Sequence, residues 1–197
     1  DIISELLPKI NLTHVSIFNN HIGDYGIEGI QDTFELLEQL GIAILKKIDF
    51  ISNTKIINTG LLEYSGYFYN SILSDYGYRL IDLLLKNKKK LNLLSEEKLI
   101  INGHFGIEKI RELSDIEINF FHALMNLDAN LLIRHQPHLI QDPFKLNKNE
   151  IYSSIGDFCF SNEYSQKSEG LLVIYNEDNL STTYYKLFCD GSKLRLK

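Results

Sequence analysis

Short apolar runs bounded by polar residues recur along the chain, and each predicts a buried strand. These runs lie at residues 13–18, 55–61, 98–102, 130–133 and 151–160. Nearer the C-terminus, apolar positions alternate at residues 170–175 and 182–188, which predicts an antiparallel hairpin with a loose turn between its strands. Residues 192–197 are expected to add an edge strand to this hairpin.

Between several of these strands the apolar residues recur every three or four positions, which predicts helices. The predicted helices cover residues 1–10, 27–40, 67–86 and 114–127. Gly41 is suited to end the second helix, because glycine readily adopts the left-handed conformation that follows a helix. Ser114 and Glu117 have the spacing of a capping box, in which each side chain satisfies a backbone N–H of the first turn.

With 197 residues the chain is long enough for one domain with a substantial core. Strands alternate with helices through most of the chain and dominate its end. We therefore expect an α/β fold in which helices flank mixed β-sheets.

Histidines follow three of the predicted strands. These histidines are His21, His104, His135 and His138. Ligands bind at the carboxyl ends of strands in open α/β sheets, and imidazole is a common metal ligand. The sequence therefore predicts one metal site at one edge of one sheet. His14 and His122 lie inside predicted elements, and we interpret them as partly buried residues with ordinary hydrogen bonds.

The polar residues around His21 could add to this chemistry. The amide oxygen of Asn20 can bind a metal without adding charge, and His21 can then act as general acid to a leaving oxygen. Asp24 and Asp157 are carboxylates near the site, although each could equally be a turn residue. No phosphate-binding loop or serine-nucleophile motif is present.

The composition excludes some functions. The net charge of −6 argues against nucleic acid as the main partner, because affinity for nucleic acid depends largely on neutralising phosphates. No apolar run is long enough to span a membrane. Cys159 and Cys189 could pair across C-terminal strands, but two small buried thiols are the interpretation we prefer.

Three ordered segments resemble the CapA family of bacterial capsule and poly-γ-glutamate synthesis proteins. These segments are VSIFNNHIGDYG at 15–26, GHFGIE at 103–108, and ANLLIRHQPH at 129–138 followed by SIGDF at 154–158. The fold of that family resembles calcineurin-like metallophosphoesterases, which implies a metallophosphatase-like sandwich here. The resemblance implies the metal ligands Asn20, His104, His135 and His138. It also implies that His21 is the catalytic acid or a phosphate-contacting group.

The resemblance also indicates residues that support the ligands or contact substrate. These residues are Asn19, Asp24, Glu108, Arg134 and Asp157. Two of them depart from the family pattern, since Arg134 stands at a usual glycine and Asp157 at a usual asparagine. Arg134 is expected to place a positive charge at the metal edge, where it would bind an anionic ligand or displace a metal.

The largest departure concerns the start of the chain. Members of the family begin with a strand that ends in a Gly-Asp pair, followed by an Asn-Leu-Glu segment, and neither precedes Thr13. We therefore expect residues 1–197 to be the C-terminal portion of a single CapA-like domain that lacks its N-terminal strand or strands. A degenerate site is the alternative.

The resemblance implies a role in capsule or surface-polymer biosynthesis at the cell envelope or membrane. The first hypothesis is a hydrolase or transferase that uses divalent manganese, iron or zinc on a phosphate-bearing substrate or an acidic polymer. The second is a non-catalytic binding or scaffolding subunit of a polymer-synthesis complex. The third is a metal-independent α/β binding domain with incidental histidines. The sequence does not identify the substrate.

Overall fold

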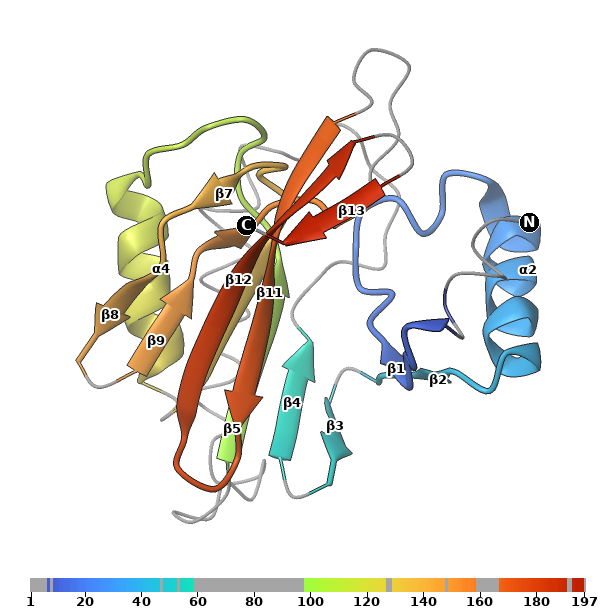
Figure 1. Cartoon of the computed structure of the whole chain (residues 1–197), viewed down its shortest axis with the longest axis horizontal. Coiled ribbons are helices and arrows are strands. Elements are labelled where there is room, and N and C mark those ends of the chain that lie inside the picture. The colour runs from blue at the N-terminus through green and yellow to red at the C-terminus, as the bar shows by residue number, and fades with distance from the viewer. Residues whose placement is uncertain are drawn as a thin grey trace.

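The computed structural model describes residues 7, 9–46, 48–52, 54–58, 98–126, 129–147, 149–158, 167–190 and 193–196. It shows a mixed α/β fold with several sheets and few helices (Figure 1). The helix predicted at 67–86 lies outside these residues, as does most of the one predicted at 1–10. Cys159 also lies outside them, and with it the possible bond to Cys189.

The central element is a six-stranded mixed sheet with the order β3-β4-β5-β6-β9-β8. Its strands are β3 (Ile48–Ile51), β4 (Thr54–Asn58), β5 (Lys98–His104), β6 (Leu131–His135), β8 (Phe144–Leu146) and β9 (Asn149–Tyr152). The four inner strands are parallel, and the two edge strands are antiparallel to their neighbours. Parallel strands covered on both faces read as continuous apolar runs, which is why β5 and β6 were predictable.

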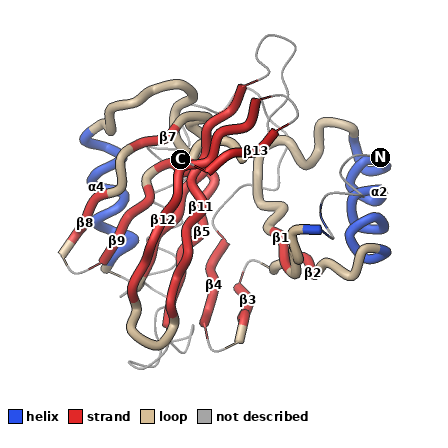
Figure 2. Tube along the Cα trace, in the orientation of Figure 1, coloured by secondary structure: helices blue, strands red, loops and turns tan. Residues whose placement is uncertain are grey.

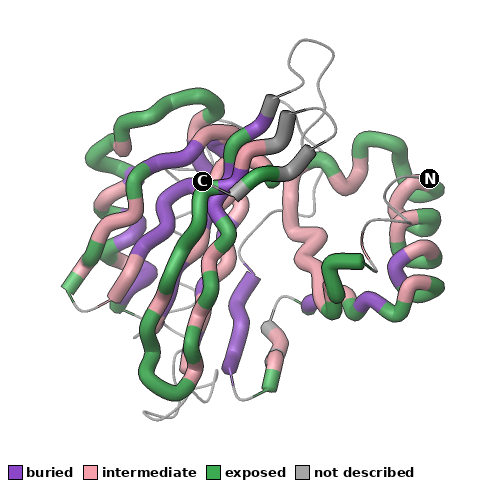
Figure 3. Tube along the Cα trace, viewed as in Figure 1, coloured by how far each residue is buried: buried purple, intermediate pink, exposed green. Residues whose placement is uncertain are grey.

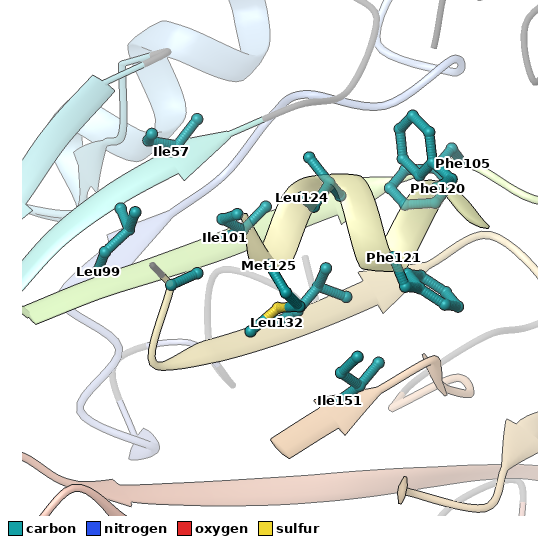
Figure 4. Packing of buried hydrophobic residues seen from close by; sticks show 11 residues of the cluster. Ile57, Leu99, Ile101, Phe105, Phe120, Phe121, Leu124, Met125, Leu132 and Ile151 are labelled. Atoms are coloured by element: carbon teal, nitrogen blue, oxygen red, sulfur yellow. The ribbon is translucent and has the colours of Figure 1, made fainter. Parts of the chain in front are cut away.

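One face of this sheet is covered by α4 (Asp115–Met125). Figure 4 shows how the helix lies over β5 and β6, with its apolar side chains directed at theirs. The buried core residues here are Ile57, Leu99, Ile101, Phe105, Phe120, Phe121, Leu124, Met125, Ala129, Leu132 and Ile151. Neither α4 nor any other helix in the described part of the chain is long and apolar enough to cross a membrane.

The opposite face is covered by a three-stranded antiparallel sheet. Its strands are β11 (Lys167–Asn176), β12 (Ser181–Asp190) and β13 (Lys193–Leu196). A second core cluster fills the space between the sheets, and its buried members are Leu131, Ile140, Tyr152 and Leu171. The predicted hairpin and edge strand are both confirmed. Figure 3 shows the result, with β4 buried along its length and the hairpin largely exposed or half-buried.

The strand predicted at 151–160 is divided in the structure. β9 ends at Tyr152, and the chain then leaves the six-stranded sheet to form β10 (Ser154–Ile155), which pairs with β7 (Ile140–Gln141). Gly156 follows with a φ of +66° and bridges to Gly170. A Cβ at Gly156 would lie 2.2 Å from the Glu169 carbonyl oxygen, so the close approach requires glycine.

The N-terminal segment differs most from the prediction. The strand expected at 13–18 is reduced to β1 (His14–Val15), which pairs with β2 (Ala43–Ile44) outside the six-stranded sheet (Figure 2). The chain turns soon after β1, because the Asn19 backbone and side chain both donate to the Ile17 carbonyl. Strands as short as β2 and β3 gave no recognisable pattern in the sequence.

The helix that follows this turn was predicted closely. α2 (Gly26–Gln39) occupies the expected residues. Gly41 ends it with a φ of +68°, and its backbone N–H donates to the Glu38 carbonyl at 2.9 Å.

The capping box of α4 is confirmed and can be tested. Ser114 Oγ accepts a hydrogen bond from the Glu117 backbone N–H at 3.3 Å, and the Glu117 carboxylate accepts one from the Ser114 backbone at 2.9 Å. Ser114→Ala is expected to lower the free energy of unfolding by about 1 kcal/mol, measured by urea denaturation. Asn119→Ala, at an exposed position of the same helix, is the control and should change stability by less than about 0.5 kcal/mol. Equal effects of the two substitutions would contradict the capping role.

Candidate functional site

Polar side chains gather at the carboxyl ends of β4, β5 and β6. In the strand register Asn58 lies beside Asn102, and His104 lies beside His135. Side chains alternate between the faces of a sheet, so all four project from the same face. This face is the one that packs against β11, because Ile100 and Ile133 on the same side join the Leu171 cluster. The site therefore lies at the strand ends, on the β11 side of the six-stranded sheet.

His104 and His135 form the centre of this group. Their rings are stacked, with centroids 6.4 Å apart and an interplanar angle of 16°. Burial lowers the pKa of His135 to about 4. Burial, the neighbouring His135 and, more weakly, His138 and His21 lower the pKa of His104 to about 4, although a hydrogen-bonding effect of Gln136 opposes them. Both imidazoles are therefore neutral at pH 7.

The turn after β1 brings Asn20 and His21 to this centre. Asn20 Oδ1 lies 3.0 Å from His104 Nε2, and Asn20 Nδ2 lies 3.3 Å from His21 Nε2. Asn19 Oδ1 accepts the His21 backbone N–H at 2.8 Å, which shapes the turn. Asp24 Oδ2 lies 2.7 Å from His21 Nδ1, so the carboxylate orients the ring and leaves Nε2 facing Asn20. The structure thus brings together residues that are 84 positions apart in the sequence.

His138 and Asp157 form a second oriented pair. His138 Nδ1 lies 2.9 Å from Asp157 Oδ1. The hydrogen bond with Asp157 raises the pKa of His138 against the opposing effect of burial, and the charges of Asp157 and Glu108 add to the rise. The Asp157 backbone N–H donates to the Glu169 carbonyl at 2.8 Å, which anchors the carboxylate beside β11. The pairing leaves His138 Nε2 directed away from Asp157.

Arg134 does not lie where we expected it. The guanidinium is fully buried on the α4 side of the sheet, since Arg134 and His135 are adjacent in β6 and point to opposite faces. Its Nη1 lies 2.5 Å from Glu117 Oε1, and it packs over the rings of Phe105 and Phe121. Its charge is therefore paired inside the core and is not placed at the histidine edge.

The carboxylate of Glu108 contacts Gln136, which lies in the sequence between the candidate ligands His135 and His138. Its Oε1 atom accepts a hydrogen bond from Gln136 Nε2 at 3.4 Å. Gln136 in turn lies beside His104. The side chain of Gln136 therefore connects Glu108 to His104.

Three residues of the site were missed in the sequence. Asn102 Oδ1 lies 3.0 Å from His135 Nε2, and Asn102 is joined to Asn58 by a 2.8 Å hydrogen bond. Gln136 is 6% exposed, has a φ of +103°, and buries a carboxamide oxygen that has no hydrogen-bond partner. Polar residues at the end of apolar strands were the available signal for the two asparagines. For Gln136 the signal was its position between two candidate ligands.

The donors at this site are mostly neutral. Within the described residues, no group of three or more histidine, cysteine, aspartate or glutamate side chains is arranged to hold a metal ion. Imidazole nitrogens and amide oxygens dominate the centre, while Asp24 and Asp157 each pair with a histidine. Chemically the arrangement offers lone pairs for a cation or hydrogen bonds for a polar substrate.

Comparison with known proteins agrees with the segments noted in the sequence. The chain is 22% identical over 190 residues to the PGA biosynthesis protein CapA of Bacillus subtilis (strain 168), covering 87% of this chain and 49% of that protein. It is 22% identical over 187 residues to the capsule biosynthesis protein CapA of Bacillus anthracis, covering 86% of this chain and 45% of that protein. No protein-family model matches the chain.

The chain spans about half the length of these two curated relatives. Both alignments nonetheless cover most of this chain, and both relatives carry the same name. The predicted resemblance is confirmed: the chain is related to the CapA proteins.

Proposed function

We propose that the strand-end residues form a divalent-metal site in a metallophosphatase-like sandwich that takes part in capsule or poly-γ-glutamate biosynthesis. The names of the two relatives support the cellular role, which would place the protein at the cell envelope. One observation carries the chemical proposal: the amide oxygen of Asn20 lies beside His104, and the ring of His104 stacks with that of His135. A phosphate-bearing molecule or an acidic polymer is the substrate class that a cation at this position would attract.

The donor types at this site, imidazole nitrogen and amide oxygen, suit a divalent metal. Manganese, iron and zinc accept imidazole nitrogen together with neutral oxygen donors. His104 Nε2 and Asn20 Oδ1 lie 3.0 Å apart in a hydrogen bond, so an ion that replaced the proton between them would contact both residues. The buried amide oxygen of Gln136, a residue that influences the pKa of His104, could be a further donor. Asn20, His104, His135 and His138 would hold the metal.

The residues around such a site have separable tasks. A bound divalent ion would supply Lewis-acid polarisation of a phosphoryl or carbonyl oxygen and lower the pKa of bound water. His21 is the candidate general acid, because Asp24 orients the ring through Nδ1, and Nε2, after taking up a proton, would donate it to a leaving oxygen. Its side chain is more than half exposed, so a substrate can reach it. Asp157 orients His138 in the same way that Asp24 orients His21.

Removing two of the proposed ligands tests the metal site. The double variant His135→Ala/His138→Ala is expected to bind Mn²⁺ and Zn²⁺ more than about 100-fold more weakly than the wild type, because losing a supporting residue alone costs 10–100-fold. Isothermal titration of the metal-free protein measures both affinities. His122→Ala removes an exposed imidazole from α4 and is the matched control. Unchanged affinity in the double variant, or no binding by the wild type, would contradict the proposal.

A non-catalytic subunit is the second candidate. It is favoured by the donor set, since the two carboxylates pair with histidines and the remaining donors at the centre are neutral. Metal stoichiometry and turnover of a simple phosphate ester separate the two candidates. Two metal equivalents with turnover that His21→Ala abolishes would support the enzyme, whereas one equivalent without turnover would support the binding subunit.

A further inference from the structure

A series of hydrogen bonds between side-chain amides connects His135 to the backbone of Lys46. Asn102 Oδ1 lies 3.0 Å from His135 Nε2, and Asn102 Nδ2 donates to Asn58 Oδ1 at 2.8 Å. Asn58 Nδ2 then donates to the Lys46 carbonyl oxygen at 2.6 Å. Asn58 is fully buried, so its amide has no bulk water as a substitute partner.

This chain of hydrogen bonds has one possible direction. The Lys46 carbonyl oxygen can only accept, so Asn58 must turn its NH₂ group toward it. The Asn58 oxygen then faces Asn102 and requires the Asn102 NH₂ group. Reversing either amide alone would bring two oxygens or two NH₂ groups face to face and leave both without a hydrogen bond.

The direction decides which nitrogen of His135 carries the proton. The Asn102 atom that faces His135 is an oxygen, which can only accept a hydrogen bond. His135 Nε2 must therefore be the protonated nitrogen, and the lone pair of the neutral ring lies on Nδ1. The backbone carbonyl of Lys46, three hydrogen bonds away, thus sets the tautomer of His135.

We propose that Asn102 is a positioning residue that holds His135 as the Nε2–H tautomer and so makes Nδ1 its metal-binding atom. The use of Nδ1 as a ligand rests on the proposed function, whereas the tautomer does not. Histidine ligands commonly need such a partner, because it fixes both ring orientation and the basicity of the binding nitrogen.

The tautomer can be read directly in the metal-free protein. A two-bond ¹H–¹⁵N correlation spectrum of ¹⁵N-histidine-labelled protein at pH 7.5 distinguishes the two neutral forms, and His135→Gln identifies the signals. We expect an Nε2–H ring at His135 in the wild type. An Nδ1–H ring would overturn the proposal, and the decisive signal is read in the wild-type protein.

Substitution of Asn102 tests its role. Asn102→Leu removes the accepting oxygen and should convert His135 to a mixture of tautomers, with Zn²⁺ affinity lowered about 10–100-fold. Asn102→Asp loses the hydrogen bond to Asn58 but keeps an accepting oxygen toward His135, and it should restore the Nε2–H form. Asn119→Leu changes an exposed asparagine of α4 and should leave both readouts unchanged. Loss of stability in Asn102→Leu without any change of tautomer would show a merely structural residue and overturn the proposal.

The two proposals fail in different ways. A wild-type protein that shows the Nε2–H tautomer but binds no Zn²⁺ would refute the metal site and the ligand role of Nδ1 together. Normal Zn²⁺ affinity in Asn102→Leu with a lost tautomer preference would refute the positioning role alone. Coupled loss of tautomer preference and affinity, with rescue by Asn102→Asp, would support both.

Discussion

Replacing Arg134 by alanine is expected to lower the free energy of unfolding by about 3–5 kcal/mol. The guanidinium is fully buried and satisfies three acceptors, the Glu117 carboxylate, the Gln141 side chain and the Ser153 carbonyl. Alanine would leave the Glu117 carboxylate charged and unpaired in the core. Burial opposes ionisation of that carboxylate, but hydrogen bonds from Ser114 and the pairing with Arg134 outweigh it and keep the Glu117 pKa below its usual value.

Chemical denaturation of paired variants separates charge from packing. Arg134→Met/Glu117→Gln should be less destabilised than Arg134→Met alone, since the double variant leaves no unpaired charge, and the double-mutant cycle gives the coupling energy. Arg111→Ala, at an exposed position, is the control and should cost less than about 0.5 kcal/mol. Additive effects of the two core substitutions would show that the pairing contributes no coupling energy.

Acidification from pH 6.5 to 4.5 is expected to destabilise the metal-free protein by about 3 kcal/mol through His104 and His135. The pKa of each is lowered in the folded state from 6.5 to about 4. Between these values the unfolded chain binds more protons than the folded chain, so stability rises with pH. The contribution is fully present above pH 6.5 and is lost as pH falls toward 4. The two effects are not additive, because the charges on the two rings interact.

Urea midpoints measured at several pH values check this result. The variant His104→Gln/His135→Gln should show a much flatter dependence in this window, which lies at or above the usual pKa of glutamate. His122→Gln, on the exposed side of α4, should retain the wild-type dependence. His138 acts in the opposite sense, because its raised pKa adds stability below pH 6.5 that is lost at higher pH. A slope unaffected by the double substitution would show that neither buried ring is held neutral.

Local signals in the sequence predicted the elements that depend on nearby residues. The Ser114–Glu117 box, the end of α2 at Gly41 and the C-terminal hairpin each follow from chemistry within a few positions. The reduced strand β1 was overestimated, because the turn around Asn19 ends it before the apolar run does.

The sequence predicted which strands carry the residues of the site at their ends. It did not predict which of these residues contact one another. His104 and His135 lie in register because β5 and β6 are parallel neighbours, which strand order alone decides. The Asn102–Asn58 bond spans 44 positions and the Arg134–Glu117 pair spans 17, and no local pattern encodes either. Alternation along β6 could have shown that Arg134 and His135 face opposite ways. The burial of Arg134 against α4 could be seen only in the three-dimensional structure.

One carboxylate joins two parts of the molecule. Glu117 Oε2 accepts from the backbone and hydroxyl of Ser114, while Glu117 Oε1 pairs with Arg134. A thermal fluctuation that unwinds the first turn of α4 also separates Arg134 from the carboxylate of Glu117. Arg134 immediately precedes His135 in β6. Such an opening cannot remain confined to the helix, because an uncompensated guanidinium would draw water into the core. Unwinding of the first turn of α4 is therefore expected to disturb the end of β6, which carries His135.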